Sequence, residues 1–227
     1  MPDIAVAIVI PTLDEESSLR ANLPGALAAA DEVIVSDGGS HDGTLAVARR
    51  LGAKVVSGAP GRGPQLNRGA QAASGADAFL FLHADTRLPE SALDGVRRAV
   101  AEGRVGGGFR ARFDSDRPIF RLGDRLVDLR TRLTRAPLGD QAQFASREAF
   151  EQLGGFRDWP ILEDLDFIRR LNRCGETVVL PLRVTTSARR YLQRGIFHTI
   201  ATNWLIWVLF FLGVSPHRLA RLYRHVR

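Results

Sequence analysis

The chain has 227 residues, of which 45% are hydrophobic and 25% charged, a composition typical of a folded globular protein. Its formal net charge of +6 comes almost entirely from arginine, because Lys54 is the single lysine. The arginines are spread out and form no recognisable nucleic-acid-binding module, so a phosphorylated substrate or an anionic lipid is favoured over nucleic acid. The single cysteine, Cys174, excludes an internal disulfide framework and is typical of a reducing cytoplasm.

Apolar runs alternate with helical patterns through the first half of the chain. The N-terminal run has no basic segment before it and no cleavage site, so it predicts a strand and not a signal peptide. Strands are expected at 4–10, 33–36, 54–57 and 78–82, and helices at 17–30, 43–51, 65–73 and 90–102. Such alternation predicts a parallel sheet with right-handed crossovers.

The pattern changes after residue 106. Residues 117–135 predict an amphipathic helix, one face of which carries Ile119, Leu122, Leu126, Leu129 and Leu133. The other elements expected here are strands at 109–113 and 141–145, helices at 148–153 and 163–173, and two short strands at 177–180 and 184–186, separated by Pro181.

The segment 196–214 is strongly apolar and is followed by Arg218, Arg221, Arg224 and Arg227. Its uninterrupted apolar run, 204–212, is shorter than the roughly 20 residues that a membrane-spanning helix needs. This favours a segment that lies in the membrane interface or docks on the domain. The sequence therefore predicts one α/β domain at 1–195, with a mostly parallel central sheet and helices on both faces, and an apolar, basic helical appendage at 196–227.

Acidic residues follow the ends of several predicted strands. They are Asp14 and Glu16 after the first strand, Asp37 after the second, Asp85 after the fourth, and the later pair Glu163 and Asp164. In an open α/β sheet, ligands bind outside the carboxyl ends of the strands, so these carboxylates are expected in one cleft. Several carboxylates together suit a hard divalent metal and the hydroxyls of a sugar or nucleotide. The pattern indicates an enzyme that acts on a nucleotide-linked substrate.

The order of motifs resembles the family 2 glycosyltransferases. The segments that carry the resemblance are 10–16 (IPTLDEE), 35–44 (VSDGGSHDGT), 61–69 (GRGPQLNRG), 79–85 (FLFLHAD) and 163–164 (ED). This family implies a GT-A fold and inverting transfer of a sugar from a UDP- or GDP-linked donor to a hydroxyl acceptor, with Mn²⁺ or Mg²⁺. It also implies a nucleotide-sugar half at 1–112 and an acceptor half at 113–195. Segments 82–86, 137–141 and 186–190 are similar to a bacterial subgroup labelled arsenosugar-biosynthesis-like glycosyltransferases.

The resemblance places the donor near the first three motifs. It implies that Asp37 accepts a hydrogen bond from the imide N–H of a uracil or guanine ring. Gly38 would let the ligand approach the backbone, although Asp-Gly-Gly-Ser also forms a helix-capping turn unaided. The other donor-side residues that it implies are Pro11, Thr12, Asp14, Glu16, Arg62 and Asn67.

The metal site is where the sequence departs from the family pattern. Asp85 occupies the last position of the family's DxD segment and is the implied ligand of the metal that bridges to the diphosphate. His83 replaces the first aspartate. A neutral imidazole is a ligand better suited to Mn²⁺ than to Mg²⁺. His83 can equally be a packed or hydrogen-bonded side chain, so both interpretations stay open.

The resemblance also assigns the chemical step. Asp164 would remove the proton of the acceptor hydroxyl, with Glu163 as the second candidate base. Acids at a helix N-terminus are also favoured by the helix dipole alone. Arg189 and Arg190 would clamp the leaving diphosphate. Asp140 and Gln141 would line the acceptor side.

Two other functions compete with a transferase. The loss of the first DxD aspartate allows a catalytically degenerate nucleotide-sugar-binding protein, against which the retention of Asp37, Asp85 and Asp164 argues. A nucleotidyltransferase would have a glycine-rich, arginine-containing loop after the first strand, where this chain is acidic. The apolar tail and the basic 117–135 helix favour a lipid-linked or membrane-proximal acceptor, and a cytoplasmic enzyme with peripheral contact on the inner face of the cell membrane.

Overall fold

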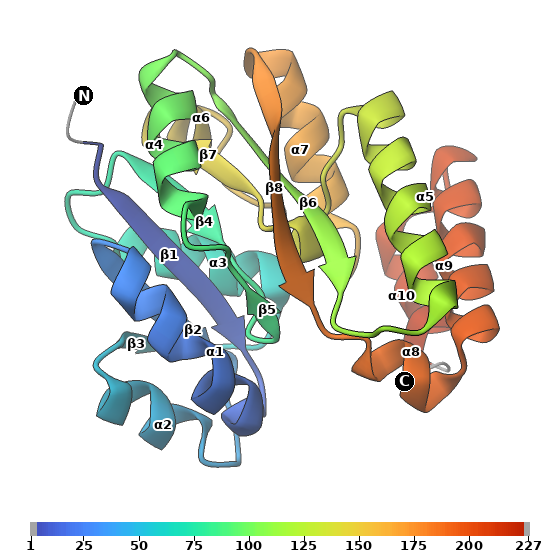
Figure 1. The fold of residues 1–227 in the computed structure, drawn as a ribbon, viewed down its shortest axis with the longest axis horizontal. Helices are drawn as coiled ribbons and strands as arrows, with labels where there is room; N and C mark the ends of the chain where they lie inside the picture. The colour runs from blue at the N-terminus through green and yellow to red at the C-terminus, as the bar shows by residue number, and fades with distance from the viewer. Residues whose placement is uncertain (1–3, 225–227) are drawn as a thin grey trace.

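The computed structural model describes residues 4–224, and one eight-stranded sheet forms its centre (Figure 1). The strand order is β3-β2-β1-β4-β7-β6-β8-β5. The strands are β1 (Val6–Thr12), β2 (Glu32–Asp37), β3 (Lys54–Ser57), β4 (Ala78–Phe81), β5 (Thr86–Arg87), β6 (Gly106–Phe113), β7 (Phe144–Ser146) and β8 (Thr177–Thr186). The helices are α1 (Glu16–Ala29), α2 (Thr44–Leu51), α3 (Arg62–Ala72), α4 (Ala92–Ala101), α5 (Pro118–Thr134), the 3₁₀ turn η1 (Gly139–Gln141), α6 (Arg147–Gln152), α7 (Glu163–Cys174), α8 (Arg189–Arg194), α9 (Ile196–Phe211) and α10 (Pro216–Arg224).

Most strands of the sheet run in one direction, as the sequence predicted. Strands β3, β2, β1 and β4 pair in parallel, and β6 pairs in parallel with β8. Strand β7 is antiparallel to both β4 and β6, so the β6–β8 pair runs in the same direction as β1. The arrowheads of β1, β6 and β8 accordingly point to the same edge in Figure 1. This edge gathers the segments that follow six strands, β1, β2, β3, β4, β6 and β8, and it is where the candidate site lies.

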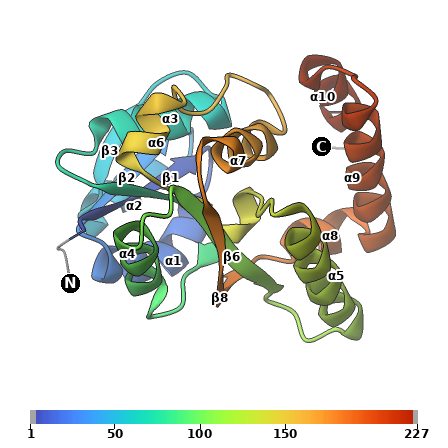
Figure 2. The same ribbon diagram turned by 90° about the horizontal axis from the view of Figure 1, so that it is seen from above.

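Two apolar layers hold the helices against the sheet (Figure 2). Successive residues of a strand point to opposite faces. Val6, Ile8 and Ile10 of β1 therefore pack with α1, α2 and α4, whereas Ala7 and Val9 pack with α3 and α7. Because both faces of β1 are covered, its sequence is apolar without alternation.

Two expected strands need correction, and two elements were missed. Residues 177–186 form one strand, since Pro181 lies at an irregularity where the register with β6 shifts between Phe109 and Arg110. At this bulge Pro181 needs no ladder hydrogen bond. Strand β7 begins at Phe144, because the preceding residues form η1 and a left-handed turn at Ala142. The two-residue strand β5 and the short helix α8 were not predicted.

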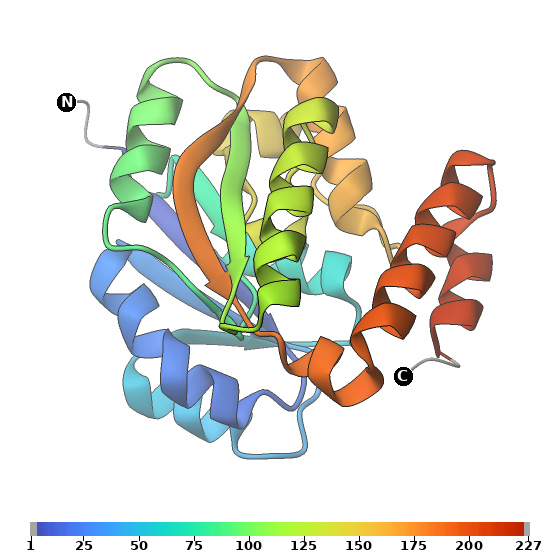
Figure 3. The same cartoon turned by 45° about the vertical axis from the view of Figure 1, so that its right-hand side comes forward.

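Helices α9 and α10 lie side by side at one end of the molecule, away from β1, β2 and β3, whereas α5 packs on β6 (Figures 1 and 3). Helix α5 matches the predicted amphipathic helix, but its leucine stripe is not in the core: Leu122, Leu126, Leu129 and Leu133 are 53–77% exposed. The predicted apolar tail forms α9, whose Trp207 and Phe210 pack against the apolar layer of α3 and α7. Within residues 4–224, no helix is both long enough and apolar enough to cross a bilayer.

Candidate functional site

Asp37, Asp85 and Asp164 lie at the carboxyl edge of the sheet, but the hollow found there is lined by Asp85 and not by Asp37 or Asp164. Asp37 ends β2, His83 and Asp85 follow β4, and Arg189 follows β8. Asp164 reaches the same region from the first turn of α7, because η1 lies between α7 and the end of β4. A parallel sheet brings these segments together although they are up to 150 residues apart in sequence.

The Asp37 carboxylate is completely buried in a ring of donors at the end of β2. It accepts hydrogen bonds from the Ser40 hydroxyl (2.5 Å), from the amides of Gly39 (2.8 Å) and Ser40 (3.0 Å), and from the Thr12 hydroxyl (3.3 Å). Burial alone would raise the pKa of Asp37, but these hydrogen bonds outweigh it and lower the pKa below the usual range. Asp37 is therefore an ionised acceptor at neutral pH.

Three residues near Asp37 fix the loop that follows it. The Gln65 side-chain amide donates to the carbonyls of Thr12 and Ser36, both at 2.8 Å. A Cβ on Gly38 would lie 3.1 Å from the Gln65 amide group, so Gln65 would have to shift by a few tenths of an ångström to admit a side chain there. Pro11 is half-buried within β1, beside this loop in the ladder with Ser36.

Asp14 and Glu16 bind the same loop from the α1 side. Asp14 accepts from the His41 amide at 2.7 Å, and Glu16 accepts from the Gly43 amide at 3.0 Å and pairs with Arg20. Asn67 is also engaged with the protein, because its amide group exchanges two 2.8 Å hydrogen bonds with the backbone of Phe156. The structure therefore gives these three predicted donor-side residues a role in shaping the loops.

Asp85 is half-buried and lies beside a hollow between α1, β8 and α8. The hollow is lined by Ser18, Ala21, Asn22, Asp85, Arg87, Asp114, Thr185, Ser187 and Arg189. Burial and the neighbouring negative charge of Glu15 raise the pKa of Asp85, while Arg190 and Arg189 act in the opposite direction. Glu15, Asn22 and Asp114 were not among the predicted site residues.

His83 faces away from this hollow, toward η1 and α7. Its Nε2 atom and the Asp164 Oδ2 atom lie 2.8 Å and 3.1 Å from the position that a Cβ on Gly139 would take. Burial, with the positive charges of Arg62 and Arg190, lowers the pKa of His83 to about 3 despite the opposing charge of Asp164. The imidazole is therefore neutral at physiological pH and faces Asp164 across Gly139.

Asp164 is oriented by two backbone amides. Its Oδ2 atom accepts from the Gly139 amide and its Oδ1 atom accepts from the Leu165 amide, both at 2.8 Å. Asp164 keeps a partly exposed surface, whereas the adjacent Glu163 is completely buried and pairs with Arg62. Burial raises the pKa of Glu163 against the opposing charge of Arg62.

The Arg62–Glu163 pair has a measurable structural role. An Arg62→Ala substitution leaves the Glu163 carboxylate buried beside Asp164, and we expect it to lower the free energy of unfolding by about 2 kcal/mol. Urea unfolding at neutral pH measures this loss. Arg121→Ala is the matched control, since Arg121 pairs with Asp116 in full solvent exposure and its removal should change nothing measurable. Equal stability of the two variants would contradict a stabilising Arg62–Glu163 pair.

The turn η1 contains the two residues predicted to line the acceptor side, Asp140 and Gln141. The Gln141 side chain is completely buried, accepts from Arg130 of α5 at 2.6 Å and donates to the Phe109 carbonyl at 2.9 Å. It is thus a structural bridge from α5 to β6. Burial raises the pKa of Asp140, with Arg130 opposing and Asp164 adding to the shift. Its Oδ1 atom is buried and has no hydrogen-bond partner among the described residues.

The donors at this edge suit a metal that also binds substrate phosphate. Among residues 4–224, no three His, Cys, Asp or Glu side chains are arranged to hold a metal ion by themselves. Mg²⁺ in phosphate-transfer sites commonly takes one or two carboxylates and completes its shell with phosphate and water. Asp85, with Glu15 beside it, fits that mode; His83 faces Asp164 instead.

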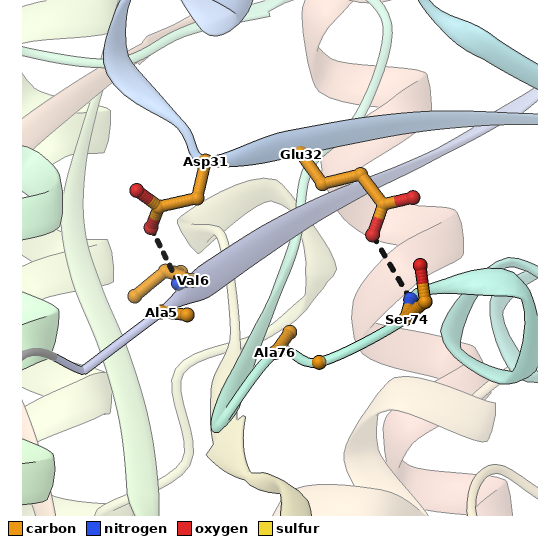
Figure 4. Close-up of a pocket in the computed structure, with 7 residues that line it drawn as sticks. Ala5, Val6, Asp31, Glu32, Ser74 and Ala76 are labelled. Atoms are coloured by element: carbon orange, nitrogen blue, oxygen red, sulfur yellow. Dashed lines mark hydrogen bonds between the residues drawn. The ribbon is translucent and has the colours of Figure 1, made fainter.

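A second hollow lies at the opposite edge of the sheet, at the amino ends of β1 and β2 (Figure 4). Its two carboxylates are occupied by the protein. Asp31 accepts from the Val6 amide at 2.7 Å, and Glu32 accepts from the Ser74 amide at 3.0 Å (Figure 4). These contacts join loops to the sheet, and the hollow contains none of the predicted site residues.

Gly139 provides a steric test of the site. In Gly139→Ala the new Cβ would press on His83 Nε2 and Asp164 Oδ2, so at least one side chain must move. Misplacing a reacting group by about 1 Å costs roughly 10²-fold in rate, and we expect a loss of this order in kcat. Gly25→Ala is the control, because a Cβ there meets nothing within 4 Å. Steady-state assays of both variants measure kcat. A wild-type kcat in Gly139→Ala would contradict the proximity of Gly139, His83 and Asp164.

Comparisons with known proteins agree with the fold. The family described as "Glycosyl transferase family 2" matches residues 7–156. No curated protein sequence matches this chain. S. aureus TarS 1-349 is 17% identical, with a TM-score of 0.62, and the match covers 82% of this chain and 61% of that one.

Two solved structures carry ligands. Mannosyltransferase PcManGT from Pyrobaculum calidifontis, in complex with GDP-Man and Mn²⁺, is 22% identical with a TM-score of 0.63, and the match covers 81% of this chain and 59% of that one. Glucosyl-3-phosphoglycerate synthase from Mycobacterium tuberculosis, with Mg²⁺ and UDP, is 24% identical with a TM-score of 0.59, covering 81% and 70%.

The chain spans about three fifths of the length of the first two of these structures. The likeness in structure establishes the mostly parallel α/β fold of the GT-A type. The family match extends over more than half of the chain, from the second residue of β1 to the loop before α7. The chain therefore belongs to glycosyl transferase family 2.

Proposed function

We propose that this chain transfers a sugar from a nucleoside-diphosphate donor to a hydroxyl acceptor, with inversion at the anomeric carbon and Asp164 as the base. The observation that carries the proposal is the convergence of Asp37, Asp85 and Asp164 at one edge of the sheet. Asp37 is an ionised acceptor, Asp85 faces a hollow, and backbone amides fix Asp164 in orientation.

In this proposal Asp37 serves the nucleobase. Its buried carboxylate already accepts four hydrogen bonds from Thr12, Gly39 and Ser40, so the loop after β2 must open before the imide N–H of uracil or guanine can replace one of them. The solved structures with GDP-Man and with UDP support a UDP- or GDP-linked donor for this chain as well. Residues 1–112 form the donor half in this proposal and residues 113–195 the acceptor half, with β6 shared across the boundary.

Asp85 would hold the divalent metal, Mn²⁺ or Mg²⁺. When bound, the metal offsets the negative charge that grows on the leaving diphosphate. Arg189 and Arg190 lie close enough to Asp85 to lower its pKa, so they place positive charge at the same point. The site thus gathers cationic charge where the leaving group departs.

Asp164 acts at the acceptor. Its carboxylate takes the proton of the acceptor hydroxyl while that oxygen forms a bond to the anomeric carbon. The bond from the anomeric carbon to the diphosphate breaks, and its electron pair leaves with the diphosphate. Glu163 is less suited to this role because it is completely buried and paired with Arg62. Neutral His83 and buried Asp140 flank Asp164 on the acceptor side.

We infer the class of acceptor and the cellular location from three further sequence segments and from the helices of the second half. The segments 82–86, 137–141 and 186–190 support the arsenosugar-biosynthesis-like bacterial subgroup. The helices around the acceptor side support a lipid-linked or membrane-proximal hydroxyl, at the cytoplasmic face of the membrane. The predicted appendage at 196–227, of which residues 225–227 lie outside the described residues, is the segment that we propose for this contact.

One observation favours a second function. His83 occupies the position where the family has an acid, and it faces Asp164 and not the hollow beside Asp85. This loss of an acid is what a catalytically degenerate nucleotide-sugar-binding protein would tolerate. A panel of UDP- and GDP-sugars, each with Mn²⁺, Mg²⁺ or chelator, separates the two. Metal-dependent thermal stabilisation with slow donor hydrolysis supports the transferase. Stabilisation without turnover of donor under any acceptor supports the binding protein, and no stabilisation by any donor would overturn both.

A further inference from the structure

The end of the molecule that carries α5 and α9 has an apolar surface that the fold leaves uncovered. On α9 and at its C-cap Leu212, the side chains of Phe197, Trp204, Leu205, Val208 and Leu212 are 51–79% exposed. Their spacing of three, four and seven residues places them along one side of the helix. On α5, the exposed residues Leu122, Leu126, Leu129 and Leu133 repeat at four, three and four residues. We call these two sets together the α5–α9 surface.

Helix α9 is held in a fixed orientation by its other side. The guanidinium of Arg130 on α5 lies 5.5 Å from the centre of the Trp207 ring, and Phe210 contacts Trp159 at 6.1 Å between ring centres. Ile206 and Thr199 are each 5% exposed. The exposed face of α9 is therefore directed outward by packing and is not the free side of a loose tail.

The charge around this surface is entirely of one sign at the C-terminal end. No Asp or Glu follows Glu176 in the sequence, whereas Arg189, Arg190, Arg194, Arg218 and Arg221 do. Helix α5 adds Arg121, Arg125, Arg130 and Arg132 against only Asp124 and Asp128. Arginines around exposed tryptophan and leucine match a layer that is anionic at its surface and apolar beneath.

We propose that the α5–α9 surface binds the anionic phospholipid face of a bilayer, with α9 lying in the plane of the membrane. Sixteen residues at 1.5 Å per residue give α9 a length of about 24 Å, less than the roughly 30 Å hydrocarbon core. Interfacial helices bury an apolar face while arginines pair with lipid phosphates. A second copy of the chain is disfavoured as the occupant, because both surfaces would carry an excess of arginine, with only Asp124 and Asp128 of α5 as opposing charges, and would repel each other.

This contact would bring the active-site edge to the lipid surface. Arg130 both stacks on Trp207 of α9 and donates to Gln141 of η1, at 2.6 Å. Gly139 in the same turn donates to Asp164. The docking helices and the base are thus joined through one short turn. The binding itself does not depend on the proposed transfer reaction, so the two can fail separately.

Vesicle sedimentation of the full chain tests the proposal without any assay of turnover. The probes are vesicles of phosphatidylcholine alone and of phosphatidylcholine mixed with phosphatidylglycerol. We expect binding to the mixed vesicles, weakened by salt, and little binding to the neutral ones. The absence of binding to anionic vesicles, or equal binding to both kinds, would overturn the proposal.

Two double variants locate the surface. Leu205→Glu with Val208→Glu on α9, and Leu126→Glu with Leu129→Glu on α5, should each weaken binding to anionic vesicles by about tenfold or more. The control is Gln71→Glu with Ala101→Glu, which adds the same charge at exposed positions on α3 and α4. Its binding should stay near wild type, since charges beyond a Debye length of about 8–10 Å are screened.

The outcomes are distinguishable. Circular dichroism and thermal melting verify that each variant is folded. If either surface variant bound anionic vesicles as well as the wild type does, the proposal that both α5 and α9 contact the membrane would be overturned. The wild type could instead form a dimer in light scattering and fail to bind vesicles. If the α9 variant abolished that dimer, the surface would be assigned to a second copy of the chain, and the proposal would be overturned.

Discussion

Asp164→Asn is expected to lower kcat for sugar transfer by about 10³-fold while leaving donor affinity close to wild type. Asparagine has nearly the same shape, and its side-chain oxygen can accept one of the two amide hydrogen bonds that orient Asp164, from Gly139 or from Leu165. Its NH₂ group cannot accept the other, so the change removes the proton acceptor and one orienting hydrogen bond. Single-turnover transfer measures the chemical step, and calorimetric titration with the donor measures affinity.

Glu163→Gln is the matched comparison, since it changes the neighbouring acid in the same way. Glu163 is buried against Arg62, so its variant should lose stability more than rate at saturating substrate. If Glu163→Gln were inactive and Asp164→Asn active, the base would be Glu163. If both transferred sugar at the wild-type rate, neither would be the base, and the proposed mechanism would be wrong.

Asp85→Ala is expected to remove the metal dependence of donor binding. The proposed metal links Asp85 to the diphosphate, and losing such a charge contact is worth several kcal/mol, which corresponds to an increase in donor Kd of roughly 10²-fold or more. The expected signature is a Kd that no longer differs between Mn²⁺ and chelator. Arg189 and Arg190 remain in this variant, so weak metal-independent binding of the donor should persist.

His83→Ala separates the two candidate ligands of the metal. The His83 imidazole lies near Asp164 and Gly139, so its removal should alter the acceptor step and leave the metal requirement for donor binding in place. Loss of that requirement in His83→Ala would make His83 a ligand. An unchanged metal dependence in Asp85→Ala would contradict the assignment of Asp85.

Much of the fold could be predicted from the sequence because most strands and helices are marked by the residue pattern within their own segment. The apolar run of β1 and the leucine spacing of α5 indicate their own structures, and acids directly after strands indicate the carboxyl edge of a parallel sheet. That edge does contain Asp37 and Asp85. The family's motifs then added Asp164, which no strand end marks.

Other features depend on neighbours far away in sequence. Pro181 interrupts a strand locally, but β8 continues through it because the partner strand β6 shifts register at that point. Asp14 and Glu16 were predicted as site residues, but Glu15 is the acid beside Asp85. The chain turns at Asp14, where φ is +55°, and Asp14 and Glu16 accept hydrogen bonds from the loop after β2. Gln141 was predicted to line the acceptor side, but its side chain is buried and accepts a hydrogen bond from Arg130 of α5.

The sequence by itself determined the strand and helix types, the carboxylates at the strand ends and the basic, apolar C-terminal segment, because these depend on side-chain periodicity and composition. Only the tertiary structure decided that His83 faces Asp164, that Glu163 is sequestered by Arg62, and that the leucines of α5 remain exposed. A side chain's partner is set by which elements pack beside it, and a pattern read along one segment does not contain that information.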